Sequence, residues 1–286
     1  MPASKRITAE AAGMKATTNQ AAGIESSGVP NKKLTGKEKK LKRKEEVAKA
    51  KAREETVRQA YSRGSILAEF QPFRKFERNG LSITLEERRA EELTAVETQF
   101  VERLLESNMK KIYGDNWPSQ AATRRQQMAE PDALYLFLHD SATSCDASSE
   151  DPSTTGSEDL VGFVHLRFVI EEDVPVLYVY ELQLGDKVQR HGLGKFLMQL
   201  MELIARKSSM KGVMLTVQKR NKGALDFYLN RMKYIVDPIS PSKSHPLAQP
   251  EDYDYEILSK IHDPETKQHL EERCKLAQAA WLSEGY

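Results

Sequence analysis

Two glycines one residue apart, Gly192 and Gly194, stand where an apolar, strand-like run gives way to a helical pattern. The run before them reads VLYVYELQL (176–184), and the residues after them place apolar side chains on one side of a helix. A strand that passes into a helix through such a turn favours an α/β architecture, because the two elements pack on each other. The N-terminus of a helix also exposes unpaired N–H groups, so this turn suits a phosphate ligand.

The common phosphate-binding motifs do not fit this turn. A P-loop needs Gly-x4-Gly-Lys-Ser/Thr, but Phe196 follows Lys195 and Gln189 stands where the first glycine belongs. A dinucleotide fingerprint needs a third glycine, and Leu197 occupies that place. The turn therefore either binds a phosphate ligand in another way or uses its glycines for backbone geometry alone.

Periodicity predicts mixed elements along the rest of the chain, with a folded part that starts near Phe70. Strands are expected at 80–85, 133–139, 160–170, 174–184 and 212–217, with a further pair near 235 and 255. Helices are expected from about 86 to 113, over 118–130, from 193, over 223–232 and from Asp263 to near Trp281. The Ser-rich stretch between the second and third strands has no periodicity and is predicted to be a mobile surface loop.

Several classes of protein are disfavoured by composition. We find no apolar run of membrane-spanning length and no secretory leader, so no membrane partner is expected. The two cysteines, Cys145 and Cys274, lie too far apart for a disulfide framework or a zinc motif, and we expect no metal. A reducing compartment, the cytosol or the nucleus, is predicted.

Charge is distributed unevenly. Residues 1–60 carry 15 Lys and Arg against 7 Asp and Glu, although the whole chain has a net charge of +1. The first thirty residues are small and polar and are predicted to be disordered. The segment that follows, 32–60, is predicted to be a basic helical arm, which acts as a nuclear-localisation or polyanion-binding segment or is simply a solvated charged helix.

Two blocks of sequence resemble the GCN5-related N-acetyltransferases (GNAT). The glycine turn reads Gln-x-x-Gly-x-Gly after a strand, which is similar to the loop that holds the pyrophosphate of acetyl-coenzyme A in that family. The second block, Asn221 to Tyr228, is similar to the family's Asn-x-x-Ala-x-x-Phe-Tyr helix. The resemblance implies an α/β (α+β) fold with a central mixed, mainly antiparallel twisted sheet flanked by helices.

A narrower resemblance covers roughly 70–260. FRKFERNGL, VHLRF, LYVYELQL, KGVMLTV and YEILS resemble the histone N-terminal acetyltransferases of NatD type, as does the lysine-rich leader. This implies acetyl transfer from acetyl-coenzyme A to the N-terminal Ser of histones that begin Ser-Gly-Arg-Gly, in nucleus and cytoplasm. The chain is then divided into a tail (1–31), the arm (32–60), an acetyltransferase domain (65–262, with the loop 140–159) and a C-terminal helix (263–286).

The resemblance also implies roles for individual residues. Glu181 is the candidate base, through a β-bulge that turns it toward the cleft, and Tyr180 and Tyr228 are further catalytic candidates. Without the resemblance, Glu181 would be a carboxylate on an exposed sheet face. The coenzyme-binding candidates are Leu182, Gln183, Leu184, Gln189, Arg190, His191, Gly192, Leu193, Gly194, Lys195 and Asn221. For Leu182 and Leu184 core packing is the alternative, and for Asn221 a helix cap.

The same resemblance also implies which residues form the cleft that binds the acceptor. Its candidates are Tyr113, Trp117, Glu171, Tyr178, Tyr180, Thr216, Ser240 and Tyr255. One departure is that Val169 stands where the relatives often carry an Asp, so that either Glu172 supplies the charge or the selectivity for Arg is weaker. Three alternatives stay open: acetylation of other N-termini, acetylation of lysine side chains, and a non-catalytic module that binds coenzyme A and docks its arm on a ribosome or a nucleic acid.

Overall fold

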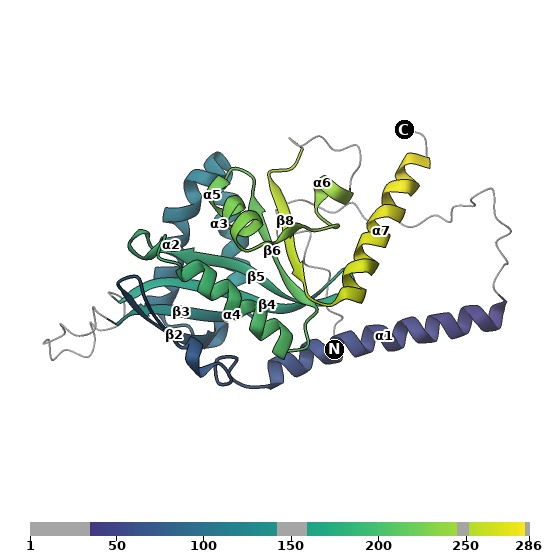
Figure 1. The fold of residues 1–286 in the computed structure, drawn as a ribbon, viewed down its shortest axis with the longest axis horizontal. Coiled ribbons are helices and arrows are strands. Elements are labelled where there is room, and N and C mark those ends of the chain that lie inside the picture. The colour runs from purple at the N-terminus through teal and green to yellow at the C-terminus, as the bar shows by residue number, and fades with distance from the viewer. Residues whose placement is uncertain (1–34, 142–158, 245–251, 284–286) are drawn as a thin grey trace, which may run out of the picture.

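The protein folds around one eight-stranded sheet, as the computed structural model of residues 35–141, 159–244 and 252–283 shows (Figure 1). The strand order is β1-β2-β3-β4-β5-β6-β8-β7. All neighbouring strands pair antiparallel except β5 and β6, which pair parallel. The strands are β1 (Lys75–Arg78), β2 (Leu81–Arg89), β3 (Leu134–Asp140), β4 (Leu160–Glu171), β5 (Val174–Leu184), β6 (Gly212–Gln218), β7 (Ile235–Val236) and β8 (Tyr255–Ile261). The mixed, mainly antiparallel sheet predicted from the sequence is therefore confirmed.

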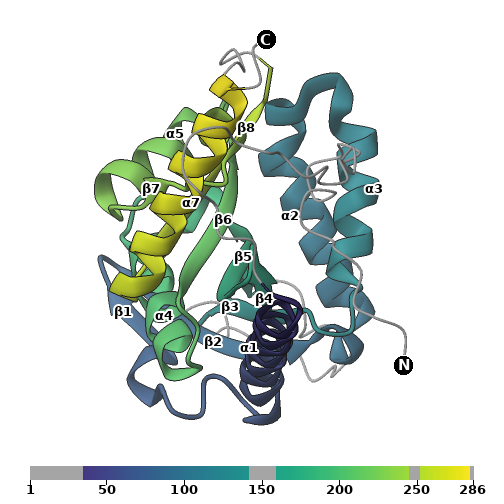
Figure 2. The same ribbon diagram turned by 90° about the vertical axis from the view of Figure 1, so that its right-hand side faces the viewer.

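Helices cover both faces of this sheet. The longer ones are α1 (Gly36–Ser62), α2 (Ala95–Tyr113), α3 (Trp117–Met128), α4 (Leu193–Lys207) and α7 (Pro264–Ser283). One face packs against α4 and the C-terminal end of α1, and the opposite face packs against α2 and α3. Helix α7 also packs on this second face through Leu270, so that β5 and β6 lie between α2–α3 and α7 (Figure 2). The shorter helical segments are α5 (Lys222–Asp226), the π-helix Phe227–Arg231, α6 (Pro241–Ser244) and four 3₁₀ turns, at Gln71–Phe73, Ala90–Glu92, Gly114–Asn116 and Asp186–Val188.

The lysine-rich segment forms α1, which projects from the body of the molecule (Figure 1). Its C-terminal half is held, because Ala60 is buried, the Tyr61 hydroxyl accepts a hydrogen bond from the backbone N–H of Phe168 at 2.9 Å, and Arg53 pairs with Asp173 at 3.0 Å. Ile66 and Leu67 are also buried, so the packed body begins before the predicted Phe70. The predicted tail and almost all of the predicted Ser-rich loop lie outside the described residues.

The helix predicted from about Glu86 starts nine residues later, at Ala95. Residues 86–89 continue β2, because their backbone pairs with β3. Thr94 then begins α2 with a capping box, in which its hydroxyl accepts from the Glu97 N–H and the Glu97 carboxylate accepts from the Thr94 N–H at 2.8 Å. The sequence-based boundary was therefore wrong on the N-terminal side, while the end at Tyr113 was correct.

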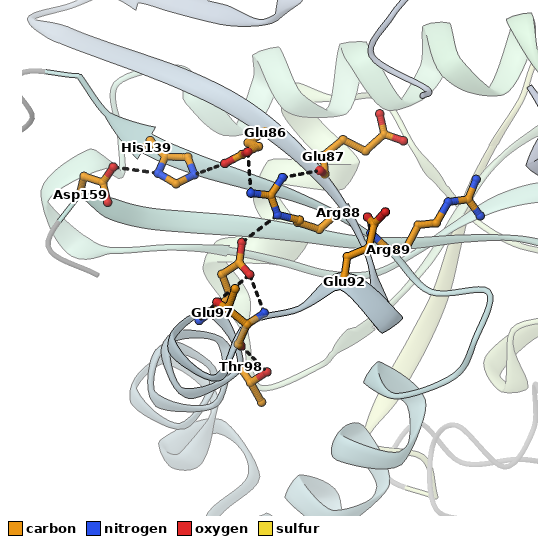
Figure 3. Close-up of polar contacts among 10 residues, drawn as sticks. Glu86, Glu87, Arg88, Arg89, Glu92, Glu97, Thr98, His139 and Asp159 are labelled. Atoms are coloured by element: carbon orange, nitrogen blue, oxygen red, sulfur yellow. Dashed lines mark hydrogen bonds and ion pairs between the residues drawn. The ribbon is translucent and has the colours of Figure 1, made fainter. Parts of the chain in front are cut away.

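A charged network fixes the start of α2 to the sheet (Figure 3). Arg88 Nε lies 3.2 Å from Glu97, whose side chain is only 8% exposed. On the same strand Glu86 pairs with Arg88 and also approaches His139 of β3, whose other ring nitrogen lies 2.9 Å from Asp159. This arrangement holds α2 across the sheet, so that its far end, at Tyr113, meets β5.

Candidate functional site

The central feature of the site is the divergence of β5 and β6. The two strands pair only over three residues, Leu177–Val179 with Val213–Leu215, although β5 continues to Leu184 and β6 to Gln218. Beyond Val179 the edge of β5 is no longer taken up by β6. A cavity of about 340 Å³ opens at this point, bordered also by α2, α3, α5 and the π-helix. Unpaired strand edges are rare inside a fold, so this opening can bind an extended ligand through its backbone.

A β-bulge in β5 sets the direction of Glu181. The register with β4 shifts between His165, which pairs with Glu181, and Leu166, which pairs with Val179, so that Tyr180 is the extra residue. Tyr178 and Tyr180 pack on the face covered by α7, and Glu181 also lines the cavity instead of pointing to the opposite face. The bulge predicted for this strand is therefore present.

Both oxygens of the Glu181 carboxylate are held. Arg124 Nε of α3 donates to Oε1 at 2.7 Å, and Gln183 Nε2 donates to Oε2 at 2.8 Å. The carboxylate is only 8% exposed and the guanidinium 13%. Gln183 is itself fixed, because Asn108 of α2 donates to its side-chain oxygen at 2.9 Å. Three elements thus orient one buried carboxylate toward the cavity.

Arg124 is equally constrained. It also donates to the hydroxyl of Tyr113 and to Gln120 Oε1 at 3.0 Å, and its guanidinium carbon lies 4.7 Å from the centre of the Tyr113 ring. Burial works against its positive charge, but Glu181 and Tyr113 raise the pKa of the guanidinium above its usual value. Arg124 is therefore a fixed cation beside the carboxylate.

Buried phenols surround this pair. Burial, with a smaller effect of nearby charges, raises the pKa of Tyr113 and of Tyr180 to about 12 each. The pKa of Tyr228 is raised further, first by burial and then by Glu181. These tyrosines are therefore proton donors at neutral pH, and Tyr228 is placed at the wall of the cavity.

The glycine turn forms the start of α4 at the end of the diverging strand. Gly192 has a φ of 88°, in the left-handed region, and Arg190 before it has a φ of 65°. His191 is bound to the β1–β2 turn, since Asn79 Nδ2 donates to its carbonyl oxygen at 2.7 Å. Gln189 Nε2 donates to the Leu184 carbonyl at 2.9 Å, which links the turn to β5.

This turn can bind a phosphate. The first N–H groups of a helix, here those from Leu193 to Lys195, have no partner within the helix. Arg190, Gly192 and Lys195 are exposed, so cations and backbone donors face the solvent together. The donor set is compatible with the pyrophosphate that the resemblance implies, and its binding there stays a prediction. A Cβ at Gly194 would lie 3.4 Å from the ring of Phe227, which is close to ordinary van der Waals contact.

Asn221 lies on the other side of the opening. Its side-chain oxygen accepts from the Ala224 N–H at 3.1 Å, so it caps α5, and it also lines the cavity. The helix cap that the sequence left as an alternative is therefore real and compatible with a ligand-binding role. Leu182, Gln183 and Leu184 line the cavity as well, and the two leucines also pack against the core.

The predicted acceptor residues only partly come together. The hydroxyls of Tyr178 and Thr216 are hydrogen-bonded across β5 and β6, and the rings of Tyr178 and Tyr180 lie 4.9 Å apart. Glu171 and Tyr255 both influence Tyr178 electrostatically, and burial is the main cause of its raised pKa. Trp117 packs beside Tyr113 in the core under α2 and α3.

Two predicted contributors are occupied elsewhere. Ser240 is completely buried; it donates to Glu256 at 2.6 Å, accepts from the Ile257 N–H, and does not line the cavity. Glu172 accepts from Arg273 of α7 at 2.7 Å, so it is not available to replace the charge missing at Val169. Glu171 is only 5% exposed and remains the carboxylate of this region.

Sequence reasoning missed Asn108, Arg124 and Gln120. Asn108 left a signal, because it stands in the row of α2 that contains Val101, Leu105 and Met109, which are all buried. Arg124 left none, since it is one of two adjacent arginines and only the fold shows which one turns inward. Among the described residues no group of His, Cys, Asp and Glu has the arrangement of a metal site, and no helix is both long and apolar enough to span a membrane.

Comparison with known proteins gives a family match over the part of the chain that contains the cavity-lining residues. Residues 107–234 match the model of the acetyltransferase (GNAT) family. Similar solved structures include an acyl-CoA N-acyltransferase from Pseudomonas aeruginosa (12% identity, 63% of this chain and 100% of that chain, TM-score 0.42). The PaiA N-acetyltransferase from Thermoplasma acidophilum, solved with coenzyme A, has 16% identity over 63% of this chain and 99% of its own, with a TM-score of 0.40. The NatC complex bound to Gag peptide and CoA contains a chain with 12% identity over 63% of this chain and 98% of its own, with a TM-score of 0.38.

Proposed function

We propose that the protein is an acetyltransferase of the GNAT type that depends on acetyl-coenzyme A, and that its acceptor is the free α-amine of a histone N-terminus beginning Ser-Gly-Arg-Gly. The observation that carries the proposal is the buried Glu181 carboxylate, which faces the opening between β5 and β6 beside two tyrosines. An α-amine titrates near 8, well below a lysine, so a modest base is sufficient.

The residues of the site divide the chemistry between them. Acetyl-coenzyme A supplies an activated thioester when bound, with its pyrophosphate at the turn from Gln189 to Lys195. Glu181 accepts the proton of the acceptor amine, directly or through one water. A backbone N–H on the free edge of β5 stabilises the negative charge that develops on the acetyl oxygen. Tyr228, a protonated phenol at the cavity wall, donates the proton that the leaving thiolate requires.

The acceptor selectivity is proposed from the surface beside this opening. Tyr178, Tyr180 and Thr216 form an aromatic and hydroxyl-bearing stretch that favours a small first residue. Glu171 would pair with a basic residue further along the peptide. Glu172, just after β4, is bound to Arg273, and Val169 is apolar. We therefore attribute this preference to Glu171 alone among these three residues. Acetylation of other N-termini or of lysine is the competing function.

Rates on matched peptides test this proposal. Wild-type protein should acetylate Ser-Gly-Arg-Gly faster than Ser-Gly-Ala-Gly, and Glu171→Lys should reduce that ratio roughly tenfold, the equivalent of about 1.4 kcal/mol. Glu172→Lys is the matched control, with the same charge change next to it, and should leave the ratio near that of wild type. Equal rates on an N-terminally blocked lysine peptide would transfer the assignment to lysine acetylation.

We further propose that α1 binds the phosphate backbone of a nucleic acid, ribosomal or chromosomal, and that the protein acts in the nucleus as well as the cytoplasm. Lys37, Lys40, Lys44 and Lys51 lie on one exposed side of the helix, at spacings of three, four and seven residues. That side is roughly opposite the row that ends in Val57 and Ala60, which packs on the body. The helix has no apolar face, so charge is what it offers to a partner.

Charge-matched variants test the arm. Replacing these four lysines by Gln should weaken binding to duplex RNA or DNA and reduce the dependence of affinity on salt. The control replaces four other cations of α1 by Gln: Lys39, Lys42, Arg43 and Lys49. This set removes the same charge, but from the side of the helix that also carries glutamates. Equal effects of the two sets would mean that only net charge matters, and retained affinity in both would show that α1 is not the nucleic-acid-binding element. A fluorescent fusion of each set reports on nuclear enrichment.

A further inference from the structure

We propose that Arg124 makes this site selective for α-amines over lysine side chains. Its positive charge balances the negative charge of the Glu181 carboxylate before the acceptor binds. The inference rests on the proposed function, because it assumes that Glu181 meets the acceptor amine. Nothing in the motif blocks points to Arg124, which lies on α3, outside the glycine turn and the Asn221 helix.

The geometry makes Arg124 a permanent part of the site. Its three guanidinium nitrogens bond to Glu181, Gln120 and the Tyr113 hydroxyl, so the cation has no other position to adopt without losing several contacts. With the side chains 13% and 8% exposed, water does little to screen the pair. Arg124 and Glu181 together are neutral, and both line the cavity.

A charged ammonium group is therefore disfavoured in this cavity. An unpaired carboxylate would attract it, whereas the carboxylate of Glu181 already has a cation at 2.7 Å. A neutral amine meets no such penalty, and the carboxylate keeps lone pairs that are free to accept its N–H, directly or through water. The site thus admits an amine in proportion to its neutral fraction.

The neutral fraction separates the two acceptor classes. At pH 7.5 roughly one third of an α-amine is neutral, but only about one in a thousand lysine side chains is, given their ordinary pKa values. Among the described groups that face Glu181, none besides Arg124 carries a positive charge that could balance the carboxylate. His165, on β4, is neutral because burial lowers its pKa to about 3, and the remaining titratable neighbours are phenols. These phenols are Tyr113, Tyr135, Tyr180 and Tyr228.

The test compares two peptides and two arginines. The peptides are Ser-Gly-Arg-Gly with a free N-terminus and an N-terminally acetylated Ser-Gly-Lys-Gly. Arg124→Gln should reduce the ratio of their kcat/KM values at least tenfold, mainly through a lower KM for the lysine peptide. Arg125→Gln is the matched control on the same helix, because Arg125 faces outward and pairs with the exposed Glu102, and it should leave the ratio unchanged.

The pH profile separates selectivity from structural damage. Without the cation, the pKa of the bound amine rises, so the acidic limb of kcat for the α-amine peptide should move to higher pH. Arg124→Lys retains the charge and should retain the ratio even if turnover falls. Calorimetric binding of coenzyme A verifies that each variant is folded.

The outcomes are distinguishable. A ratio within twofold of wild type in Arg124→Gln, with turnover lowered equally at every pH, would overturn the role of Arg124 and leave the proposed function intact. Loss of selectivity in Arg124→Lys would also overturn it, because geometry and not charge would then be responsible. Wild-type preference for the lysine peptide would instead refute the proposed function itself.

Discussion

The losses of stability from removing the two charges of the Arg124–Glu181 pair should not be additive. Either single change, Glu181→Gln or Arg124→Gln, leaves an uncompensated charge in a place where the side chains are 8% and 13% exposed. Breaking a buried pair from one side typically costs 3–5 kcal/mol. Tyr113 and Gln120 still bind Arg124 in the first variant, so we expect about 3 kcal/mol, at the lower end of this range.

The double variant Glu181→Gln/Arg124→Gln has no buried charge and keeps two amides that can bond to each other. Its loss of stability should be about 2–3 kcal/mol smaller than the sum of the two single losses. Urea unfolding without coenzyme measures the four free energies, because a bound ligand would raise the apparent stability of each variant differently. The difference between the loss in the double variant and the sum of the single losses should persist in 1 M NaCl, since a buried pair is poorly screened.

Additivity within about 0.5 kcal/mol would refute this reasoning, because it would mean that solvent compensates each charge separately. Turnover supplies an independent measurement. Glu181→Gln should lower kcat roughly 100-fold, the usual scale for loss of a general base, while coenzyme affinity stays near that of wild type. Activity of Glu181→Gln near that of wild type at neutral pH would remove Glu181 as the base, whatever its contribution to stability.

Further predictions follow from single groups. Gly192→Ala should weaken coenzyme binding and cost about 1 kcal/mol, because the φ of 88° strains any other residue; calorimetry and urea unfolding check both, and unchanged values would contradict the left-handed conformation. Tyr228→Phe should lower kcat about tenfold or more with coenzyme affinity retained, and full activity would exclude it as the proton donor. His165 has a folded pKa of about 3 against about 6.5 unfolded, so only the unfolded chain takes up its proton between these values, and stability should fall by about 1.4 kcal/mol per pH unit below pH 6.5. His165→Gln should remove this dependence, and an equal slope in the variant would show that another group is responsible.

The sequence predicted the order of the elements well where the periodicity is long and uninterrupted. The strands around Leu134, Leu160 and Val174 start within one residue of their expected positions, because buried strands give continuous apolar runs. The start of α2 was misplaced because residues 86–89 are charged and suit a helix by composition. Only their pairing with β3, a contact about fifty residues away, makes them a strand.

In the candidate site too, the sequence predicted residues that belong to local motifs and missed residues that only distant contacts bring in. Short local motifs located Gln189 of the glycine turn, Asn221 and Glu181, and all three line one cavity. Arg124 is 57 residues from Glu181, and Asn108 is 75 residues from Gln183, so no local pattern could join them. Ser240 was placed in the cleft by a motif comparison, but the fold buries it against Glu256. Motifs thus recover the groups that we propose to hold the coenzyme, which come from the β5–α4 turn and from the start of α5. The environment of the base requires α2 and α3 to cross the sheet. The character of the acceptor therefore depends on contacts that sequence spacing cannot encode.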